Sequence, residues 1–332
     1  MLFVGTQRGI EARVLPEEGW PLELIEVVGI KGRGLSGLIR GVARLPAAWQ
    51  RSRRIIRGFQ PDVVVGVGGY ASGPIVATAA MMGLPTAILE QNSVPGITNK
   101  ILGKFVRRVF TAFPDERRFF APQKVLRTGN PIRAGLNAPR EPGDRRSESS
   151  RAAGPRLFVF GGSQGARAIN RSIVESLVTL REAMPQLEIW HQTGASELES
   201  VQAGYAEAGF VGEHARVVPF IRDMAEPYAW CNLVLCRAGA TSLAELASVG
   251  RPALLVPFPH AADDHQRSNA RSLVDAGAAA LLLESELSGE RLGRELIALL
   301  ADPTALETMS RSMRKHARPR AAAEIYEALV VL

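Results

Sequence analysis

The sequence is poor in cysteine, with only Cys231 and Cys236 among its 332 residues. Both lie in the strand-like run CNLVLC, where residues five apart point to opposite faces, so we expect no disulfide between them. Two cysteines offer no metal cluster and are typical of a reducing compartment. The opening MLFVGTQRG has neither a basic segment nor a long apolar run, and therefore does not resemble a signal peptide.

Uninterrupted hydrophobic runs are also missing. The longest charge-free segment, residues 63–89, exceeds the roughly 20 apolar residues of a spanning helix. Its helix breakers are Gly66, Gly68, Gly69, Gly73, Pro74, Gly83 and Pro85. These breakers predict strand, loop, helix and strand rather than a membrane span.

The composition is otherwise that of a globular protein with a full core, since 46% of residues are hydrophobic and 22% are charged. The length favours two domains. Lys and Arg outnumber Asp and Glu by 40 to 33, a net charge of +7. Such a surface favours anionic partners: phosphates, nucleic acid or an acidic membrane face.

Short apolar runs that end in Gly-rich loops and lead into helix-like stretches predict parallel sheets with crossover helices. The expected strands are Val63–Val67, Thr86–Leu89, Leu157–Phe160, Leu233–Leu235 and Ala253–Val256. Residues 137–155, NAPREPGDRRSESSRAAGP, lack aromatic and β-branched residues and are expected to form a linker or mobile loop. We therefore predict an α/β protein with two doubly wound parallel-sheet domains, 1–136 and 156–332, that face a cleft.

One segment carries charge of a single sign. Residues 31–57 contain eight basic residues and no acidic residue, beside a Leu/Ile stripe and Trp49 at helical spacing. A solvated helix is the ordinary interpretation, but helices usually mix charge signs. The bias favours an anionic membrane surface over nucleic acid, because no nucleic-acid motif accompanies it.

The first chemical motif is FGGSQGARAIN, Phe160–Asn170, in which a strand ends, glycines turn the chain and a helix begins. Glycines let backbone N–H groups approach a ligand, and a helix N-terminus carries partial positive charge that suits a phosphate. Ser163 adds a hydroxyl. The alternative is a tight structural turn.

The second motif, CRAGATSLAELASVGRPALLVPFP at 236–259, repeats this strand–loop–helix pattern. Glu245 suits two vicinal ribose hydroxyls, because a carboxylate only accepts hydrogen bonds and has two oxygens. Alternatively, Ser242 and Glu245 form a capping box at the start of the helix.

Two further motifs follow strands. EQNSVPGITN, Glu90–Asn99, places three polar residues at the end of a strand, where they would line a cleft or cap a helix. In DDHQRSNA, Asp263–Ala270, His265 and Gln266 are candidates for contacts to a sugar. The histidines nearby do not complete a helical zinc pattern, and the sequence has no Asp-x-Asp motif, so we expect no metal.

These motifs, with GVGGYASGP, GNPIR, WHQTG and FIRDM, occur in the order found in the MurG family, which the chain resembles over nearly its whole length. The resemblance implies a two-domain GT-B architecture. It also implies transfer of N-acetylglucosamine from UDP-GlcNAc to lipid I, giving lipid II at the cytoplasmic face of the bacterial inner membrane. No metal or other cofactor is implied.

The resemblance also implies a donor site. Arg133 and Ser163 would face the diphosphate, Ile221 would hold uracil through its backbone, and Glu245 matches the ribose-binding glutamate. The full set of expected donor contacts is Asn92, Arg133, Ser163, Ile221, Ala240, Thr241, Ser242, Glu245, His265 and Gln266. His265 departs from one version of the family's glutamine pair.

Two departures concern the acceptor side. The family begins with a strand and a GGTGGH-type loop with the presumed catalytic histidine, whereas this sequence opens at what resembles the second strand. The family also often has histidine where Leu89 stands, which leaves Glu90 as the fallback candidate for the base. The alternatives are a diacylglycerol glycosyltransferase, or a truncated chain that binds UDP-sugar and membrane without efficient catalysis.

Overall fold

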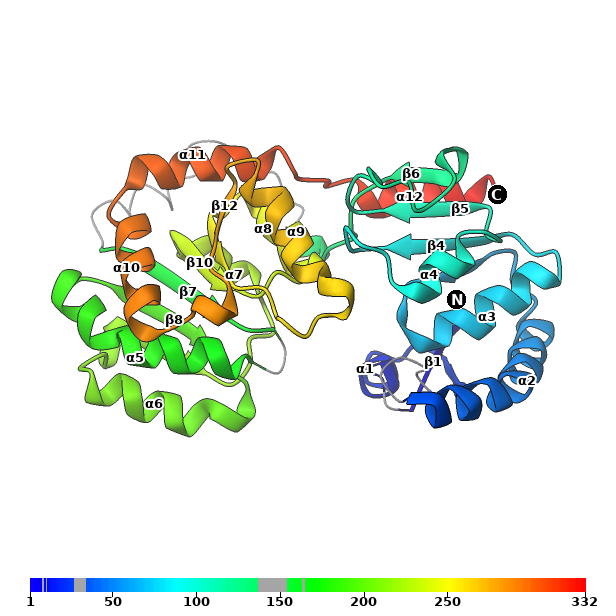
Figure 1. Ribbon diagram of the computed structural model, residues 1–332, viewed down its shortest axis with the longest axis horizontal. Helices are drawn as coiled ribbons and strands as arrows, with labels where there is room; N and C mark the ends of the chain where they lie inside the picture. The colour runs from blue at the N-terminus through cyan, green and yellow to red at the C-terminus, as the bar shows by residue number, and fades with distance from the viewer. Residues whose placement is uncertain (8, 10, 27–33, 137–153, 163–164) are drawn as a thin grey trace. The chain divides into compact units, whose positions relative to one another are not determined.

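The computed structural model describes residues 1–332 apart from 8, 10, 27–33, 137–153 and 163–164 (Figure 1). The chain forms two compact units. The first consists of Met1–Gly129 together with Ala322–Leu332, and the second of Asn130–Ala321. All strand pairs found in the described residues are parallel.

The strands of the first unit form two sheets, β1-β2 and β3-β4-β5-β6. These strands are β1 Phe3–Gly5, β2 Leu22–Leu24, β3 Val64–Gly66, β4 Thr86–Glu90, β5 Arg108–Thr111 and β6 Val125–Arg127. The helical segments are α1 Glu11–Glu17, α2 Gly34–Phe59, α3 Gly69–Met81, α4 Ile97–Leu102, the 3-10 turn η1 Pro122–Lys124 and α12 Ala321–Val330.

The four-stranded sheet of this unit is covered on both faces, because alternate side chains of a strand point to opposite sides. Ile88 of β4 and Val109 of β5 belong to the core packed by α2 and α3. Ala87 and Phe110, the neighbours of these residues, pack against Ile325 of the C-terminal helix α12. The last helix of the sequence thus closes the core of the first unit.

The second unit has one six-stranded sheet of order β12-β11-β10-β7-β8-β9. Its strands are β7 Arg156–Phe160, β8 Glu188–Gln192, β9 Ala215–Val218, β10 Leu233–Cys236, β11 Ala253–Leu255 and β12 Ala279–Leu281. Its α-helices are α5 Arg167–Ala183, α6 Leu198–Glu207, α7 Ala225–Trp230, α8 Ala240–Val249, α9 His265–Val274, α10 Gly289–Leu300 and α11 Pro303–Arg314. Short 3-10 turns are η2 Ala134–Leu136, η3 Ala195–Glu197, η4 Gly212–His214, η5 Ala262–Asp264 and η6 Glu284–Glu286.

The strand order of the second unit reverses between β7 and β10. From β7 the chain builds outward through β8 and β9, and then returns to add β10, β11 and β12 on the other side. In doubly wound sheets, ligands bind beside the carboxyl ends of the strands at such a reversal. The loops after β7 and β10 lie at this point, and they are the two Gly-rich motifs of the sequence.

Both faces of this sheet are covered. Leu157 and Val159 of β7 belong to a core that includes residues of α5 and α10, which pack closely together (Figure 1). On the opposite face of β7, the rings of Phe158 and Phe160 contact Tyr228 of α7. This packing fixes the positions of the helices on the sheet, and therefore also the positions of the loops that lead into them.

The structure agrees with the predicted strands to within about one residue at each end. Residues 63–89 contain β3, α3 and β4, as the helix breakers predicted, and none of the described helices has the length and apolar character needed to cross a bilayer. Cys231 and Cys236 are buried and form no disulfide with each other, as expected.

The domain limits differ from the predicted 1–136 and 156–332. The first boundary lies between Gly129 and Asn130, and Ala322–Leu332 joins the first unit. The physical reason for the first shift is that residues 130–136 are bonded to α8: Ser248 Oγ donates to the carbonyl of Leu136 at 2.9 Å. The second shift follows from the packing of Ile325 against β4 and β5. Most of the predicted linker, 137–153, lies outside the described residues.

Candidate functional site

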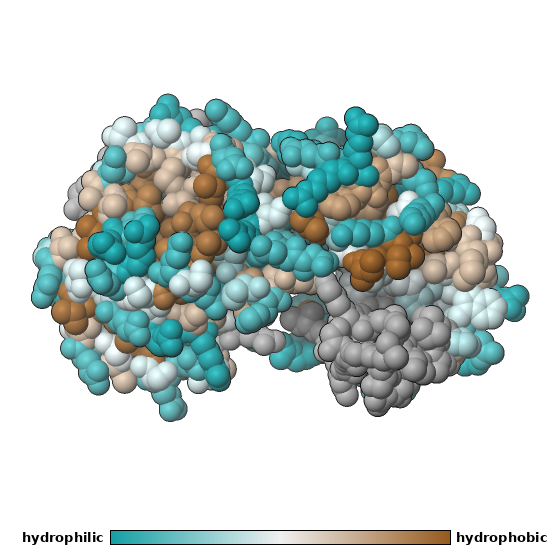
Figure 2. Space-filling model, in the orientation of Figure 1, coloured by the Kyte–Doolittle hydropathy of each residue, from teal (hydrophilic) through white to brown (hydrophobic). Residues whose placement is uncertain are grey.

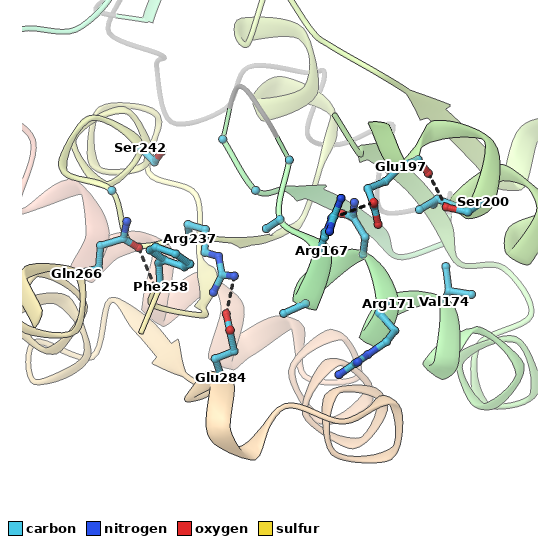
Figure 3. A pocket seen from close by; sticks show the side chains of 18 of the residues that line it. Arg167, Arg171, Val174, Glu197, Ser200, Arg237, Ser242, Phe258, Gln266 and Glu284 are labelled. Atoms are coloured by element: carbon cyan, nitrogen blue, oxygen red, sulfur yellow. Dashed lines mark hydrogen bonds and ion pairs between the residues drawn. The ribbon is translucent and has the colours of Figure 1, made fainter. Parts of the chain in front are cut away.

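A groove of about 1160 Å³ lies at the carboxyl ends of the strands of the second unit (Figure 3). Its lining includes the Gly-rich turn after β7, the loop between β10 and α8, and side chains from the loops after β11 and β12. The charged or polar groups in this part of the lining are Arg237, Ser242, Gln266 and Glu284. This volume is ample for a nucleotide sugar.

The Gly-rich turn after β7 depends on glycine for steric reasons. Gly162 and Gly165 have φ angles of +99° and +78°, which L side chains rarely adopt. A Cβ on Gly165 would lie 1.9 Å from the carbonyl oxygen of Thr193. Gln192 Nε2 donates to the carbonyl of Gly162 at 3.0 Å, so β8 holds the turn in place. The predicted phosphate contact Ser163 lies outside the described residues.

The loop between β10 and α8 places three predicted residues at a helix N-terminus. Helix α8 begins at Ala240, with Gly239 as its N-cap and no side chain capping it. Ser242 therefore does not cap the helix, and the capping-box alternative is wrong. Glu245 instead turns into the protein, where its carboxylate accepts a hydrogen bond from the Tyr228 hydroxyl at 3.1 Å.

Residues of the GNPIR segment lie against this loop. Arg133 Nε is 3.9 Å from Glu245 Oε1, and Asn130 Nδ2 donates to Thr241 Oγ1 at 3.2 Å. Arg133 is exposed, whereas Glu245 is only 4% exposed. Burial raises the pKa of Glu245, while the Arg133 guanidinium and the Tyr228 hydroxyl oppose that rise. The Arg133 guanidinium and the Glu245 carboxylate therefore lie close together at α8, the helix whose N-terminus is at Ala240.

The side chain of Gln266, at the start of α9, is oriented by a hydrogen bond from the backbone. The backbone N–H of Phe258 donates to Gln266 Oε1 at 3.0 Å, so the amide nitrogen is the end left to contact a ligand (Figure 3). The neighbouring His265 has Nδ1 2.7 Å from the carbonyl of Ala262. Gln266 lines the groove, whereas His265 does not.

Arg237 is a residue that sequence reasoning missed. Its guanidinium donates to the carbonyls of Val256 and Pro257, pairs with Glu284 at 2.5 Å and lies over the Phe258 ring (Figure 3). It therefore ties together the loops after β10, β11 and β12. The signal available in the sequence was an arginine directly after a fully apolar strand.

Two predicted residues, Glu90 and Asn92, belong to the first unit. Glu90 is 3% exposed and organises its own loop. Its Oε1 accepts from the backbone N–H of Asn92 at 3.0 Å, and its Oε2 accepts from Asn99 Nδ2 at 2.8 Å. Asn92 is thus presented by a loop that the Glu90 carboxylate holds.

The structure pairs Arg133 with Glu245 and bonds Thr241 to Asn130 of the same GNPIR segment. Ser242 and Gln266 line the groove, whereas Arg133, Thr241 and Glu245 lie outside its lining. Ile221 is 9% exposed, follows β9 and does not line the groove. Over the described ranges, no group of three or more His, Cys, Asp or Glu residues is arranged to hold a metal ion.

Comparison with known proteins gives two matching domain models, both of one family. Residues 2–111 match the Glycosyltransferase family 28 N-terminal domain, and residues 156–325 match the Glycosyltransferase family 28 C-terminal domain. Among solved structures, the chain is similar to MurG of Acinetobacter baumannii, with 32% identity and a TM-score of 0.77 over 100% of this chain and 90% of that one. A UDP-GlcNAc 2-epimerase from Neisseria meningitidis, at 13% identity and a TM-score of 0.65 over 99% of this chain and 90% of that one, shares the fold.

Two curated relatives have the name UDP-N-acetylglucosamine--N-acetylmuramyl-(pentapeptide) pyrophosphoryl-undecaprenol N-acetylglucosamine transferase. The protein from Anaeromyxobacter dehalogenans strain 2CP-C is 51% identical over 100% of this chain and 85% of its own length. The protein from Myxococcus xanthus strain DK1622 is 50% identical over the same shares.

Proposed function

Because this chain belongs to glycosyltransferase family 28 and, within it, to the MurG family, we propose that it transfers N-acetylglucosamine from UDP-GlcNAc to lipid I. Lipid I is the undecaprenyl-pyrophosphoryl-N-acetylmuramyl-(pentapeptide), and the product is lipid II of peptidoglycan synthesis. The observation that carries this proposal is the groove at the strand reversal, which is lined by the Gly-rich turn after β7 and by Gly239 and Ser242 at the start of α8, the helix that also carries Glu245.

The donor would bind with its ribose at Glu245 and its diphosphate near the N-terminus of α8. The unpaired N–H groups of a helix start favour an anion. Arg133 adds a fixed cation with several donors, which suits phosphate oxygens. Gln266 would donate its amide to the sugar, and Asn92, Ile221 and His265 complete the proposed donor contacts.

Family membership implies an inverting displacement, in which the acceptor hydroxyl attacks the anomeric carbon and UDP leaves. Negative charge grows on the leaving diphosphate as the glycosidic bond breaks. Arg133 and the helix N-terminus at Ala240 would stabilise that charge, and groups fixed before the reaction do so most effectively. These residues therefore act on the transition state as well as on binding.

The test is a transfer assay with labelled UDP-GlcNAc and a lipid I analogue, run beside calorimetry with UDP. Glu245→Gln keeps the size of the side chain but removes the charge that accepts two ribose hydroxyls. We expect UDP affinity to fall at least about 10-fold, on the scale of a hydrogen bond to a charged group. Glu295→Gln on α10 is the matched control and should leave UDP affinity unchanged. An unaltered affinity in folded Glu245→Gln would remove the ribose role, and transfer to diacylglycerol instead of lipid I would remove the acceptor.

We also propose that the protein works as a peripheral protein on the anionic cytoplasmic face of the bacterial inner membrane. On α2, Arg54 and Arg57 are exposed, and Arg53 lies over the Trp49 ring at 5.5 Å. Arg51 pairs with Glu23 at 2.6 Å, so it contributes less free charge than its sequence context predicted. Lys31, Arg33, Arg40 and Arg44 fall where the structure describes no side chain.

A second feature of the first unit supports this proposal. Ile97 and Ile101 of α4 and the following Phe105 are exposed by 57%, 52% and 65%. Lys100 and Lys104 stand between them in the sequence, and Figure 2 shows the hydrophobic surface over α4. Apolar side chains among basic ones are typical of a surface that sits at a lipid interface.

Sedimentation with vesicles tests the membrane proposal. Each basic residue near an anionic surface contributes about 1 kcal/mol, so Arg54→Glu with Arg57→Glu should weaken binding by one to two orders of magnitude. Arg291→Glu with Arg294→Glu on α10 changes the net charge equally and should bind as the parent does. Equal binding of the parent to neutral and anionic vesicles would contradict the electrostatic account.

A further inference from the structure

A buried tyrosine lies behind the proposed ribose site. Tyr228 is 0% exposed, and its hydroxyl donates to Glu245 Oε2 at 3.1 Å. The other carboxylate oxygen, Oε1, faces Arg133 Nε at 3.9 Å, which is beyond hydrogen-bond distance. Within the part of the chain that the structure describes, the Tyr228 hydrogen bond is therefore the one that orients the Glu245 carboxylate.

The fold gives Tyr228 little freedom. Its ring packs edge-on against Phe158 at 5.8 Å and Phe160 at 6.1 Å, both on β7. Its own carbonyl accepts from Arg251 Nε at 2.5 Å. The hydroxyl is therefore aimed at Glu245 by a packed ring and an anchored backbone, and β7 is also the strand that carries the Gly-rich turn.

A glutamate that binds ribose must be ionised and correctly turned. Each carboxylate oxygen offers about two acceptor positions, and a protonated carboxyl turns one acceptor into a donor. The Tyr228 hydroxyl uses one position on Oε2 and leaves the others for the 2′ and 3′ hydroxyls. Burial raises the pKa of Glu245, and the hydrogen bond from Tyr228 opposes that rise. Burial likewise raises the pKa of Tyr228, which keeps the phenol protonated as a donor.

We infer that Tyr228 is a positioning residue for recognition of the donor ribose, acting through Glu245 and not by contact with the substrate. The inference rests on the ribose role proposed above for Glu245. It assigns to α7, which contributes no residue to the groove lining, a part in selecting a ribonucleotide.

The test is Tyr228→Phe in the full chain, with UDP and 2′,3′-dideoxy-UDP as calorimetric probes. UDP affinity should fall on the order of 10-fold, as expected for loss of a hydrogen bond to a charged group. Affinity for the dideoxy probe should stay at the parent value, because that probe has no hydroxyls for Glu245 to accept. The UDP affinity of Tyr228→Phe should also begin to fall at a higher pH on acidification than that of the parent, since Glu245 would then protonate more readily.

Tyr205→Phe is the matched control. Tyr205 is equally buried, and its hydroxyl lies 3.1 Å from His191 Nδ1 instead of at Glu245. Any effect of this control should be the same for both probes. If Tyr228→Phe discriminates between the probes as strongly as the parent does, the inference is overturned.

Two results separate this inference from the proposed function. Unchanged UDP affinity in Glu245→Gln would mean that the ribose role itself fails, whatever Tyr228 does. If Glu245→Gln weakens UDP binding but Tyr228→Phe does not, only the positioning role fails. Should Tyr228→Phe not fold, Glu245→Asp moves the carboxylate away from the phenol, and the same loss of ribose discrimination is expected; parent-like discrimination there would overturn the inference.

Discussion

At the scale of single residues, the Glu90 carboxylate is engaged before any substrate arrives. It accepts from the N–H groups of Asn92 and Gly96 and from the amide of Asn99. A general base needs a free acceptor directed at the proton it removes. The hydrogen bonds of Glu90 instead favour a role in shaping the Glu90–Asn99 loop, and with it the place of Asn92.

Glu90→Gln should therefore destabilise the first unit more than it slows the chemistry. The amide group of the new glutamine would place its own N–H groups against the buried N–H donors that the carboxylate accepts in the parent. Each buried donor left without an acceptor lowers the free energy of unfolding by about 1–3 kcal/mol. Urea unfolding measures this loss, with exposed Glu18→Gln as a control that should cost nothing. A 100- to 10,000-fold drop in kcat, with loss of the acid limb of the pH profile, would instead identify Glu90 as the base.

His191 is the clearest source of pH-dependent stability. It is fully buried between Tyr205 and Asn170, and burial lowers its pKa from 6.5 to about 3. Below pH 6.5 the His191 imidazole binds a proton in the unfolded state but stays neutral in the native state. The free energy of unfolding therefore falls as the pH drops from 6.5 towards 3, by at most about 1.4 kcal/mol per pH unit from this residue.

His191→Gln should remove this part of the acid sensitivity, although it lowers stability at pH 7. Urea unfolding between pH 7 and pH 5 measures the slope. The exposed His260→Gln serves as the control and should retain the parent slope. An identical slope in His191→Gln and the parent would show that acid sensitivity has another origin.

At the scale of secondary-structure elements, the two strand–loop–helix units around β7 and β10 could be predicted from glycines placed after short apolar runs. Their exact supports could not. Gln192 and Thr193 hold the Gly-rich turn, but they come from β8 and the loop after it, some thirty residues later. Contacts of this kind depend on register between strands, which local pattern does not reveal. The capping-box alternative was wrong because α8 begins at Ala240, which puts Ser242 inside the helix, and Glu245 instead bonds to Tyr228 of another helix.

Gly165→Ala and Gly209→Ala form a matched pair that tests the turn. Both glycines have positive φ, +78° and +76°, so alanine is strained by about 1–2 kcal/mol at either. Only Gly165 has a carbonyl, that of Thr193, 1.9 Å from the new Cβ, whereas Gly209 has open space. Overpacking should add about 1–3 kcal/mol to the unfolding cost of Gly165→Ala. Gly165→Ala should also weaken UDP binding. Equal losses of unfolding free energy in the two variants would contradict tight packing of the turn against Thr193.

At the scale of the whole molecule, the sequence predicted two doubly wound domains but not which residues each contains. The error lay in assuming that a domain is continuous along the chain. Helix α12 has the sequence AAAEIYEALV, which could pack on many apolar faces. Its place is set by contacts with Ala87 and Phe110, which lie more than 200 residues earlier in the chain. Likewise, Arg133 belongs to the second unit and contacts Glu245 of α8, a long-range contact that the local sequence around Arg133 does not predict.

This division predicts how the second unit behaves alone. A fragment of residues 130–321 contains the complete six-stranded sheet, its core and the Arg133–Glu245 pair. We expect it to be monomeric, to unfold cooperatively and to bind UDP within a few-fold of the full chain. Circular dichroism, light scattering and calorimetry measure these properties.

A longer fragment, 130–332, should behave worse although it contains more of the protein. It retains α12 without its seat on β4 and β5, which leaves Ile325 and Leu329 without their partners Ala87 and Phe110. Exposed apolar stripes promote association, so light scattering should show oligomers. Ile325→Glu with Leu329→Glu should return this fragment to a monomer, while the same pair in the full chain should destabilise the first unit. If 130–332 is monomeric and 130–321 does not fold, α12 belongs to the second unit after all, and the division proposed for the molecule is wrong.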